Sequence, residues 1–234
     1  MAATTPEIER GARRWLLRES MGTASVPLIL LWSAGTWSWP MAWVLTGLYA
    51  AWVGANALLL WPNHKSLLAE RAQKRPPGVK GWDMGIMGVV GLLTIGRYVV
   101  AGLDVRFGWG PEVPLALSLA AIPVAAVGYA LVTWGMVANA WFATHVRIQK
   151  DRGQRVATGG PYRWVRHPGY VGSILFEIGS GVMLQSWWAI GIGVASAALF
   201  LVRTAMEDRT LKAELPGYSE YAKRTRYRLI PGVW

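Results

Sequence analysis

Long apolar stretches alternate with short polar ones along this chain, and their lengths predict membrane-crossing helices. Residues 21–61 contain no charged residue, which is enough for two spans of roughly 20 residues each. We expect the turn between these spans at residues 35–40, where glycine, tryptophan and proline interrupt the run. A third run, 82–103, is broken by Arg97, and a fourth run, 113–142, carries no charge.

A last apolar region extends over residues 169–202, and the polar and aromatic residues 185–188 divide it into an expected hairpin. The pattern as a whole predicts an all-α bundle of about six transmembrane spans. We expect one integral-membrane domain over residues 1–234, with the four N-terminal spans in 1–142. Residues 143–234 interleave polar and apolar positions and are predicted to end in a helical cap on the cytoplasmic side.

The basic residues fall on one side of this pattern. The chain has 24 Lys and Arg residues against 13 Asp and Glu, for a net charge of +11. In the six-span arrangement, the Lys and Arg residues lie before span one, between spans two and three, between spans four and five, and from residue 203, at the end of span six, onward. The two exceptions are Arg97 and Arg106. The positive-inside rule then puts both termini in the cytoplasm. A nucleic-acid-binding protein has no reason to show this alternation, so we expect a lipid bilayer and no nucleic acid as partner.

Residues within the apolar runs indicate structural roles. Gly85, Gly88 and Gly91 recur at helical spacing and predict close packing of the third span. Arg97 and Glu177 lie in the third and fifth spans, and we expect them to form a structural ion pair, with a transport-pathway role as the alternative. Five tryptophans are expected at the outer membrane interface: Trp37, Trp39, Trp109, Trp187 and Trp188. No cysteine is present, which excludes disulfides and thiolate metal sites, and we assign no metal ligands.

The most informative segment is a glycine- and proline-rich tract, residues 159–170, with the sequence GGPYRWVRHPGY. Irregular backbone near a bilayer is tolerated only where it is buried in protein or lines a cavity. Pro168 suits the first turn of a helix, so we expect the fifth span to begin near it and to point free N–H groups at a cytoplasmic cavity. The alternative is a tight loop anchored by a snorkelling Arg166 and a capping His167.

A second group of candidates lies at the cytoplasmic end of the last span. Arg203 and Glu207 stand four residues apart on one helix face, next to Asp208. A simple interfacial ion pair is one interpretation, but ionisable groups at the edge of a span are functional candidates by default. The following segment, 211–221, is predicted to form an amphipathic helix that continues into a turn and a basic segment lying against the membrane.

The sequence motifs in these two regions resemble those of the isoprenylcysteine carboxyl methyltransferase family and its phospholipid N-methyltransferase relatives. The similarity covers roughly residues 139–234, and its motifs are GPY at 160–162, RHPxYxG at 166–172, RxxxEDxxL at 203–211, YxxY at 218–221 and PG at 231–232. The family usually has paired glutamates where this chain has Glu207-Asp208, and a Gly-acidic-acidic-Tyr segment where it has Leu-Pro-Gly-Tyr at 215–218.

The resemblance implies an integral-membrane enzyme that uses S-adenosylmethionine without a Rossmann domain. Its cofactor pocket is expected on the cytosolic side, between the last spans and the C-terminal helix. Matching positions imply these cofactor contacts: Gln149, Gln154, Arg155, Val156, Ala157, Tyr162, His167, Pro168, Gly169, Tyr170 and Glu207. Arg203 matches the arginine that faces the substrate carboxylate, so Arg203 and Glu207 are the implied catalytic residues.

This chemistry is physically reasonable. A methyl sulfonium is already activated, so the enzyme mainly has to align the two reactants. A carboxylate acceptor needs no base and could be held bidentately by Arg203. An amine or thiol acceptor would first have to lose a proton, with Glu207 or a tyrosine assisting.

Two other functions remain open at this stage. NADPH-dependent membrane sterol and steroid reductases carry a similar tract, in which asparagine and glutamate stand where this chain has Gly169 and Ser173. A small non-enzymatic transporter would instead predict broken helices in two symmetric halves, and the sequence shows one such break. The expected methyl acceptor is an isoprenylcysteine-like carboxylate or another lipophilic or small molecule.

Overall fold

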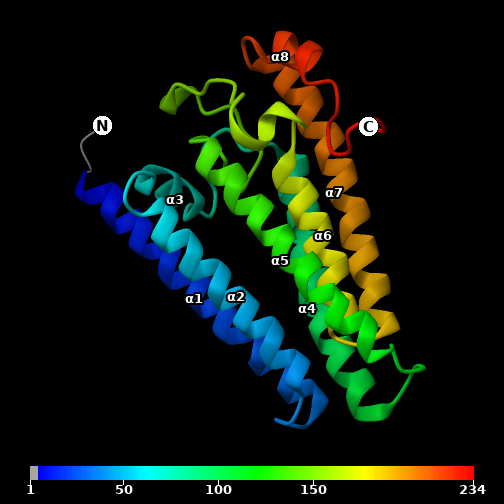
Figure 1. Cartoon of the computed structure of the whole chain (residues 1–234). Coiled ribbons are helices and arrows are strands. Elements are labelled where there is room, and N and C mark those ends of the chain that lie inside the picture. Colours follow the sequence, from blue (N-terminus) through cyan, green and yellow to red (C-terminus); the bar gives the residue numbers. More distant parts are fainter. Residues whose placement is uncertain (1–4) are drawn as a thin grey trace.

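The computed structural model describes residues 5–234, whose regular elements are all helical (Figure 1). The α-helices are α1 (Pro6–Ala34), α2 (Pro40–Leu60), α3 (Lys65–Arg71), α4 (Gly81–Phe107), α5 (Leu115–Ala138), α6 (Pro168–Met183), α7 (Trp187–Glu214) and α8 (Tyr218–Arg224). Two short 3₁₀ helices, η1 (Lys150–Arg152) and η2 (Gly160–Arg163), lie in the connection between α5 and α6. The all-α prediction is therefore confirmed.

Four of these helices, α2, α4, α5 and α7, are long and apolar enough to cross a membrane. Their outer surfaces carry large apolar side chains such as Leu58 and Leu92, which are 79% and 72% exposed. Lipid, rather than water, is the natural environment of such surfaces. The chain is a multi-pass helical membrane protein.

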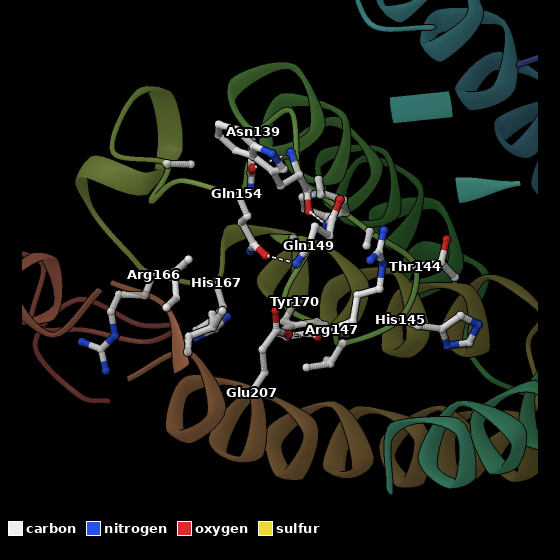
Figure 2. A pocket seen from close by; sticks show the side chains of 18 of the residues that line it. Asn139, Thr144, His145, Arg147, Gln149, Gln154, Arg166, His167, Tyr170 and Glu207 are labelled. Carbon is white, nitrogen blue, oxygen red and sulfur yellow. Dashed lines mark hydrogen bonds between the residues drawn. The ribbon is translucent and has the colours of Figure 1, made fainter. Parts of the chain in front are cut away.

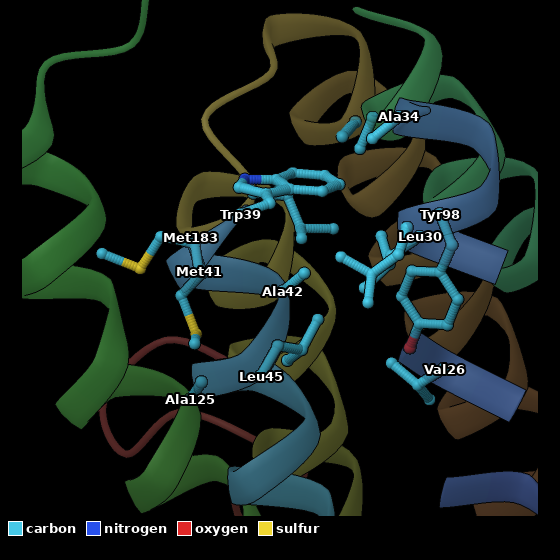
Figure 3. Packing of buried hydrophobic residues seen from close by; sticks show 14 of the residues in the cluster. Val26, Leu30, Ala34, Trp39, Met41, Ala42, Leu45, Tyr98, Ala125 and Met183 are labelled. Atoms are coloured by element: carbon cyan, nitrogen blue, oxygen red, sulfur yellow. The ribbon is translucent and has the colours of Figure 1, made fainter. Parts of the chain in front are cut away.

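Helices α1 and α6 complete the bundle. Helix α1 packs along α2 and α4, and α6 packs between α5 and α7. Their contacts form one apolar core to which α1, α2, α4, α5, α6 and α7 all contribute, with Leu30, Leu45, Tyr98, Ala125 and Met183 among its members (Figure 3). Expected spans one and five thus lie inside the helix bundle, although α6 has only 16 residues and the N-terminal part of α1 is polar.

The helix boundaries follow from local capping. The Thr5 hydroxyl accepts a hydrogen bond from the Ile8 backbone N–H at 3.3 Å, and Pro6 occupies the first turn of α1. Helix α1 ends at Ala34 and is capped by Gly35, whose φ of 68° lies in the left-handed region. Helix α6 begins at Pro168, as its position in the tract predicted, and the expected hairpin break falls between α6 and α7.

The predicted packing role of three glycines is wrong. Gly85, Gly88 and Gly91 have open space where a Cβ atom would stand. The glycine of α4 that packs closely is Gly102, where a Cβ would lie 1.9 Å from the Ser33 hydroxyl of α1. Helical spacing identifies a face of small residues, but it does not say which neighbour, if any, lies against that face.

Most of the remaining structural predictions hold. Arg97 is fully buried, and its Nη1 lies 2.6 Å from a Glu177 carboxylate oxygen, which confirms the expected pair between α4 and α6. Of the predicted interfacial tryptophans, Trp37, Trp109, Trp187 and Trp188 are exposed. Trp39 is buried instead, because it packs into the core beside Met41 and Met183 (Figure 3).

Both ends of the described chain lie at the same end of the bundle (Figure 1). The connections 61–80 and 139–167 and the C-terminal segment 215–234 gather there as well. We call this the polar end. It brings the glycine- and proline-rich tract next to the end of α7, although about 40 residues separate them in sequence.

Candidate active site

A cavity of about 220 Å³ opens at the polar end of the bundle. Most of its wall comes from the α5–α6 connection, the first turns of α6, the last turns of α7, and α8, and single residues of α3, α4 and α5 complete it. Almost every residue that the sequence suggested for cofactor or substrate lies on this wall, namely Gln149, Gln154, Arg155, Val156, Ala157, Tyr162, His167, Gly169, Tyr170, Arg203 and Glu207. Pro168 is the exception: it is buried as the first residue of α6 and does not line the cavity.

Glu207 and Tyr170 form the central pair of the cavity wall. The Tyr170 hydroxyl donates a hydrogen bond to the Glu207 carboxylate, and Figure 2 shows the two side chains meeting from α6 and α7. The expected alternative, an ion pair between Glu207 and Arg203, is absent among the described residues. Glu207 therefore has a neutral partner, so its negative charge is not cancelled by a protein cation at hydrogen-bond distance.

Arg203 has a different partner from another helix. Its Nε donates to Asp83 Oδ1 of α4 at 2.7 Å, and its Nη2 donates to the Thr144 carbonyl at 2.8 Å. The guanidinium also lies over the Tyr170 ring, 5.1 Å from the ring centre. Within residues 5–234, Nη1 makes no hydrogen bond. The terminal edge of this guanidinium is thus the part that can bind a ligand.

Asp83 is a buried carboxylate that organises this side of the cavity. Besides Arg203, it accepts hydrogen bonds from the Val146 backbone N–H at 3.0 Å and from His145 Nδ1 at 3.2 Å. His145 lines the cavity, whereas Asp83 lies behind the wall. Sequence reasoning missed both residues: Asp83 falls inside an apolar run, and His145 belongs to no recognised motif.

Asp208 has the opposite orientation to its neighbour Glu207. It is fully buried outside the cavity, where it accepts hydrogen bonds from Arg166 Nε at 2.7 Å and from the Tyr218 hydroxyl at 3.0 Å. His167 Nε2 and Arg228 Nε also lie within 3.4 Å of its oxygens. These contacts join α6, α7 and the C-terminal segment, so Asp208 serves the architecture of the cap.

Arg166 completes this arrangement. Its Nη1 donates to the carbonyls of Thr225 and Arg226, at 2.8 and 2.6 Å, while its other nitrogens bind Asp208. The backbone N–H groups of Arg166 and His167 also pair with the carbonyls of Tyr227 and Arg228. The interpretation of Arg166 as a snorkelling side chain is therefore wrong, because the C-terminal segment covers it. His167 forms no side-chain cap of α6 and instead contacts Asp208 and Tyr218.

Three buried tyrosines line the cavity where α8 packs against the α5–α6 connection. Tyr162, Tyr218 and Tyr221 are buried together with Leu211 and Leu215. Burial raises the pKa of the Tyr221 hydroxyl to about 12 and also raises the pKa of Tyr162. Burial, together with the charge of Asp208, raises the pKa of Tyr218. All three rings therefore stay neutral at physiological pH and present apolar faces to the cavity.

The connection between α5 and α6 supplies polar groups of two kinds. The Gln149 side chain is committed to the protein, since it donates to the Trp141 carbonyl at 2.8 Å and accepts from Arg152. Gln154 Oε1 accepts from the Gln149 backbone N–H at 2.7 Å (Figure 2). By contrast, the backbone groups of residues 155–157 make no hydrogen bond within residues 5–234, although this segment lines the cavity. Such groups are available to a ligand.

Other wall residues had no place in the sequence prediction. Arg71, at the end of α3, and Asn139, Trp141, Phe142, Thr144 and Arg147, from the α5–α6 connection, all line the cavity. Arg147 is fixed by Glu70 and Asp151, both at 2.8 Å. Nothing in the local sequence distinguishes these residues, because the fold brings them to the wall from separate elements. Among residues 5–234, no group of three or more His, Cys, Asp or Glu side chains could hold a metal ion.

Comparison with known proteins finds a family model and several relatives that match part of the chain. Residues 119–213 match the model of the isoprenylcysteine carboxyl methyltransferase family. The chain is 33% identical over 113 residues, 48% of each protein, to the cobalt-zinc-cadmium resistance protein CzcN of Cupriavidus metallidurans. It is 32% identical over 100 residues, 42% of this chain and 46% of the relative, to the nickel-cobalt-cadmium resistance protein NccN of Alcaligenes xylosoxydans xylosoxydans.

A third relative is a plant protein. Over 84 residues, 35% of this chain and 43% of the relative, the chain is 33% identical to protein-S-isoprenylcysteine O-methyltransferase B of Arabidopsis thaliana. The chain spans about half the length of the curated relatives it matches. The matched region contains the tract, the start of α6 and the Arg203–Glu207 turn of α7, which build most of the cavity. Residues 119–213 of this chain are therefore similar to the isoprenylcysteine carboxyl methyltransferase family.

Proposed function

We propose that this protein is an integral-membrane methyltransferase that binds S-adenosylmethionine in the cavity at the polar end and methylates a lipophilic or small acceptor. Similarity to the family alone does not assign this activity, since the names of two relatives refer to metal resistance and that of the third to methyl transfer. The observation that carries the proposal is that the residues implied as cofactor contacts, except Pro168, line one cavity together with Arg203.

The chemistry of the wall fits this cofactor. The unbonded backbone of residues 155–157 suits the hydrogen-bonding edge of an adenine, and the faces of Tyr162 and Tyr218 suit its ring. Glu207, which has no cation partner, suits the positive charge of the amino or sulfonium group. When bound, S-adenosylmethionine supplies a methyl group that is already activated on a sulfonium.

The remaining task of the protein is to position the acceptor. Asp83 and the Thr144 carbonyl hold Arg203 by two of its three nitrogens, so its orientation does not depend on a ligand. Its terminal edge then orients an anionic nucleophile, of which a carboxylate is the one implied by the family. Approximation of two bound reactants lowers a barrier by several kcal/mol, which is the main contribution required here.

We further propose that the chain forms one domain of six spans, with α1 and α6 crossing the bilayer beside the four longer helices. The basic residues of the polar end support a cytoplasmic position for this end and for both termini. A cavity at the cytoplasmic end of the spans would receive a water-soluble cofactor from the cytoplasm and a lipophilic acceptor from the bilayer.

Calorimetry on the detergent-purified protein tests the cofactor assignment. We expect heat of binding with S-adenosylhomocysteine and none with NADPH. Binding of NADPH alone would favour the reductase alternative, and absence of both signals would favour a non-enzymatic protein. Transfer of radiolabelled methyl groups from S-adenosylmethionine to an extract of membrane lipids and small metabolites would then report the activity itself.

A further inference from the structure

His145 and Asp83 form a hydrogen-bonded pair at the edge of the cavity, and His145 is one of the residues that line its wall. The Asp83 carboxylate already accepts N–H donors from Arg203 and Val146, so His145 Nδ1, at 3.2 Å, is the donor in their contact. The proton of the neutral imidazole therefore resides on Nδ1, and Nε2 carries the lone pair. Within residues 5–234, Nε2 makes no hydrogen bond, and it is not sealed from solvent. A histidine oriented by a carboxylate in this way is equipped to accept a proton.

The position of His145 suits a contact with the acceptor rather than with the cofactor. In Figure 2, His145 and Thr144 lie at one end of the wall and Arg166 lies at the other, with Gln149, Tyr170 and Glu207 between them. The implied cofactor contacts that the figure labels thus lie between these two ends: Gln149, Gln154, His167, Tyr170 and Glu207. His145 lines the cavity to one side of these residues.

A second guanidinium at this site has no acidic partner. Arg71 lines the cavity, its Nε is buried without a hydrogen bond, and its Nη1 reaches only the Phe142 carbonyl at 3.4 Å. No Asp or Glu of residues 5–234 forms a salt bridge with it. Burial lowers the pKa of Arg71 to about 10; the charge of Glu19 opposes this lowering, and the charges of Arg18 and Arg203 add to it. Two guanidinium groups in one cavity attract an anion and repel an ammonium group.

We propose that His145 is the general base of this methyltransferase and that the acceptor is a neutral, acidic X–H group, such as a thiol or a phenolic hydroxyl. The inference rests on the proposed function and specifies its acceptor. A carboxylate acceptor is already ionised, so it has no proton for the His145–Asp83 pair to remove. An amine would carry a positive charge toward Arg71 and Arg203, whereas a thiolate or phenolate formed in place would be stabilised by them.

With a thiol acceptor, methyl transfer is coupled to the loss of the S–H proton. The S–H proton passes to His145 Nε2 as the acceptor sulfur forms a bond to the methyl carbon. The bond between that carbon and the sulfonium sulfur breaks, and its electron pair stays on the donor sulfur, which becomes a neutral thioether. The imidazolium then releases its proton to water, and Asp83 stabilises it in the interval.

A series of aryl thiols of graded acidity, assayed with the full-length protein at one pH, tests this role. We choose His145→Asn because the asparagine amide can still donate to Asp83 but offers no base toward the cavity. Turnover of the least acidic thiol should fall roughly 100-fold, and the penalty should shrink toward about threefold for thiols already ionised in solution. A uniform penalty across the series would mean a structural role and would overturn the inference. Failure of the wild type to methylate any thiol or phenol, while it methylates carboxylic acids, would also overturn it.

A measurement without turnover provides an independent readout. A chromogenic aryl thiol, bound to the complex with S-adenosylhomocysteine below the pH at which the free thiol ionises, should show the absorbance of its thiolate. His145→Asn should lose this signal, and His145→Ala, if it is better folded, provides a second variant. Binding of S-adenosylhomocysteine to each variant separates the two proposals. If the wild type does not bind it, the proposed function fails; if binding is normal and the thiolate signal persists in both variants, only the role of His145 fails.

Discussion

Two ion clusters lie near successive turns of α7, and they differ in what is left unbonded. In the cap cluster, Asp208 binds Arg166, His167, Tyr218 and Arg228, and every nitrogen of the Arg166 guanidinium has a partner. In the cavity cluster, Asp83 binds Arg203 and His145, but Arg203 Nη1 and His145 Nε2 make no hydrogen bond among the described residues. The cap cluster therefore leaves no Arg166 nitrogen for a ligand, whereas the cavity cluster keeps a nitrogen of Arg203 and one of His145 that a ligand can bind.

The difference also explains why adjacent acids on one helix have separate roles. Successive residues of an α-helix point about 100° apart around its axis. Glu207 therefore faces the cavity and Asp208 faces the C-terminal segment. The family's usual second glutamate has one more methylene than Asp208, so the shorter side chain here is matched to the close approach of Arg166 and Tyr218.

The largest effect should follow from removing the centre of the cap cluster. Asp208→Asn leaves the buried Arg166 guanidinium without a counterion, which typically costs about 3–5 kcal/mol. We expect the variant to unfold at much lower SDS concentration than the wild type and to lose S-adenosylhomocysteine binding along with the cap. An unfolding midpoint equal to that of the wild type would contradict the assignment of Asp208 to architecture.

Arg203→Lys addresses the cavity cluster. The lysine keeps a positive charge beside Asp83 but lacks the planar fork that leaves a terminal edge for the acceptor. Turnover should fall by about 100-fold, comparable to the loss of one preorganised donor. Affinity for S-adenosylhomocysteine and the unfolding midpoint should stay close to those of the wild type. A parallel loss of cofactor affinity would show instead that Arg203 belongs to the cofactor subsite.

Glu207→Gln tests the middle of the cavity. Binding of S-adenosylhomocysteine should weaken by about tenfold, because a hydrogen bond to a charged group contributes about 1.5 kcal/mol or more. Tyr170→Phe, which removes the hydroxyl donor to Glu207, should weaken binding in the same direction. The matched control is Glu214→Gln on the same helix, whose carboxylate pairs with Lys80 outside the cavity. Equal effects of the two Glu→Gln changes on calorimetric affinity would refute the assignment of Glu207.

The smallest effect is expected at the rim of the cap cluster. The Lys212 side chain is 40% exposed and contacts Asp208 at 3.0 Å. Exposed pairs contribute about 0–1 kcal/mol, so Lys212→Ala should change the SDS unfolding free energy by no more than this. The comparison with Asp208→Asn then measures how much of the cluster's stability comes from its buried members. A loss as large as that of Asp208→Asn would mean that Lys212 is essential to the cluster.

Some local features followed directly from the sequence. The start of α6 at Pro168 needed only the fixed φ of proline and its missing N–H. The Arg97–Glu177 pair could be predicted because two opposite charges in an apolar bundle have few other ways to be neutralised. The partners of Arg203 could not be predicted: Glu207 was four residues away on the same helix, but Asp83 of α4 lies 120 residues away in sequence and binds it instead.

By itself, the sequence determined the helical fold, the polar end and a central group of cavity-lining residues, because hydrophobic run length, proline geometry and family motifs are local properties. The tertiary structure alone decided which glycines pack, which of Glu207 and Asp208 faces the cavity, and that Arg71, Asp83 and His145 join the site. These outcomes depend on how each helix is rotated about its axis and which neighbour it meets. That rotation is set by the packing of all the helices together, so no single segment carries the information.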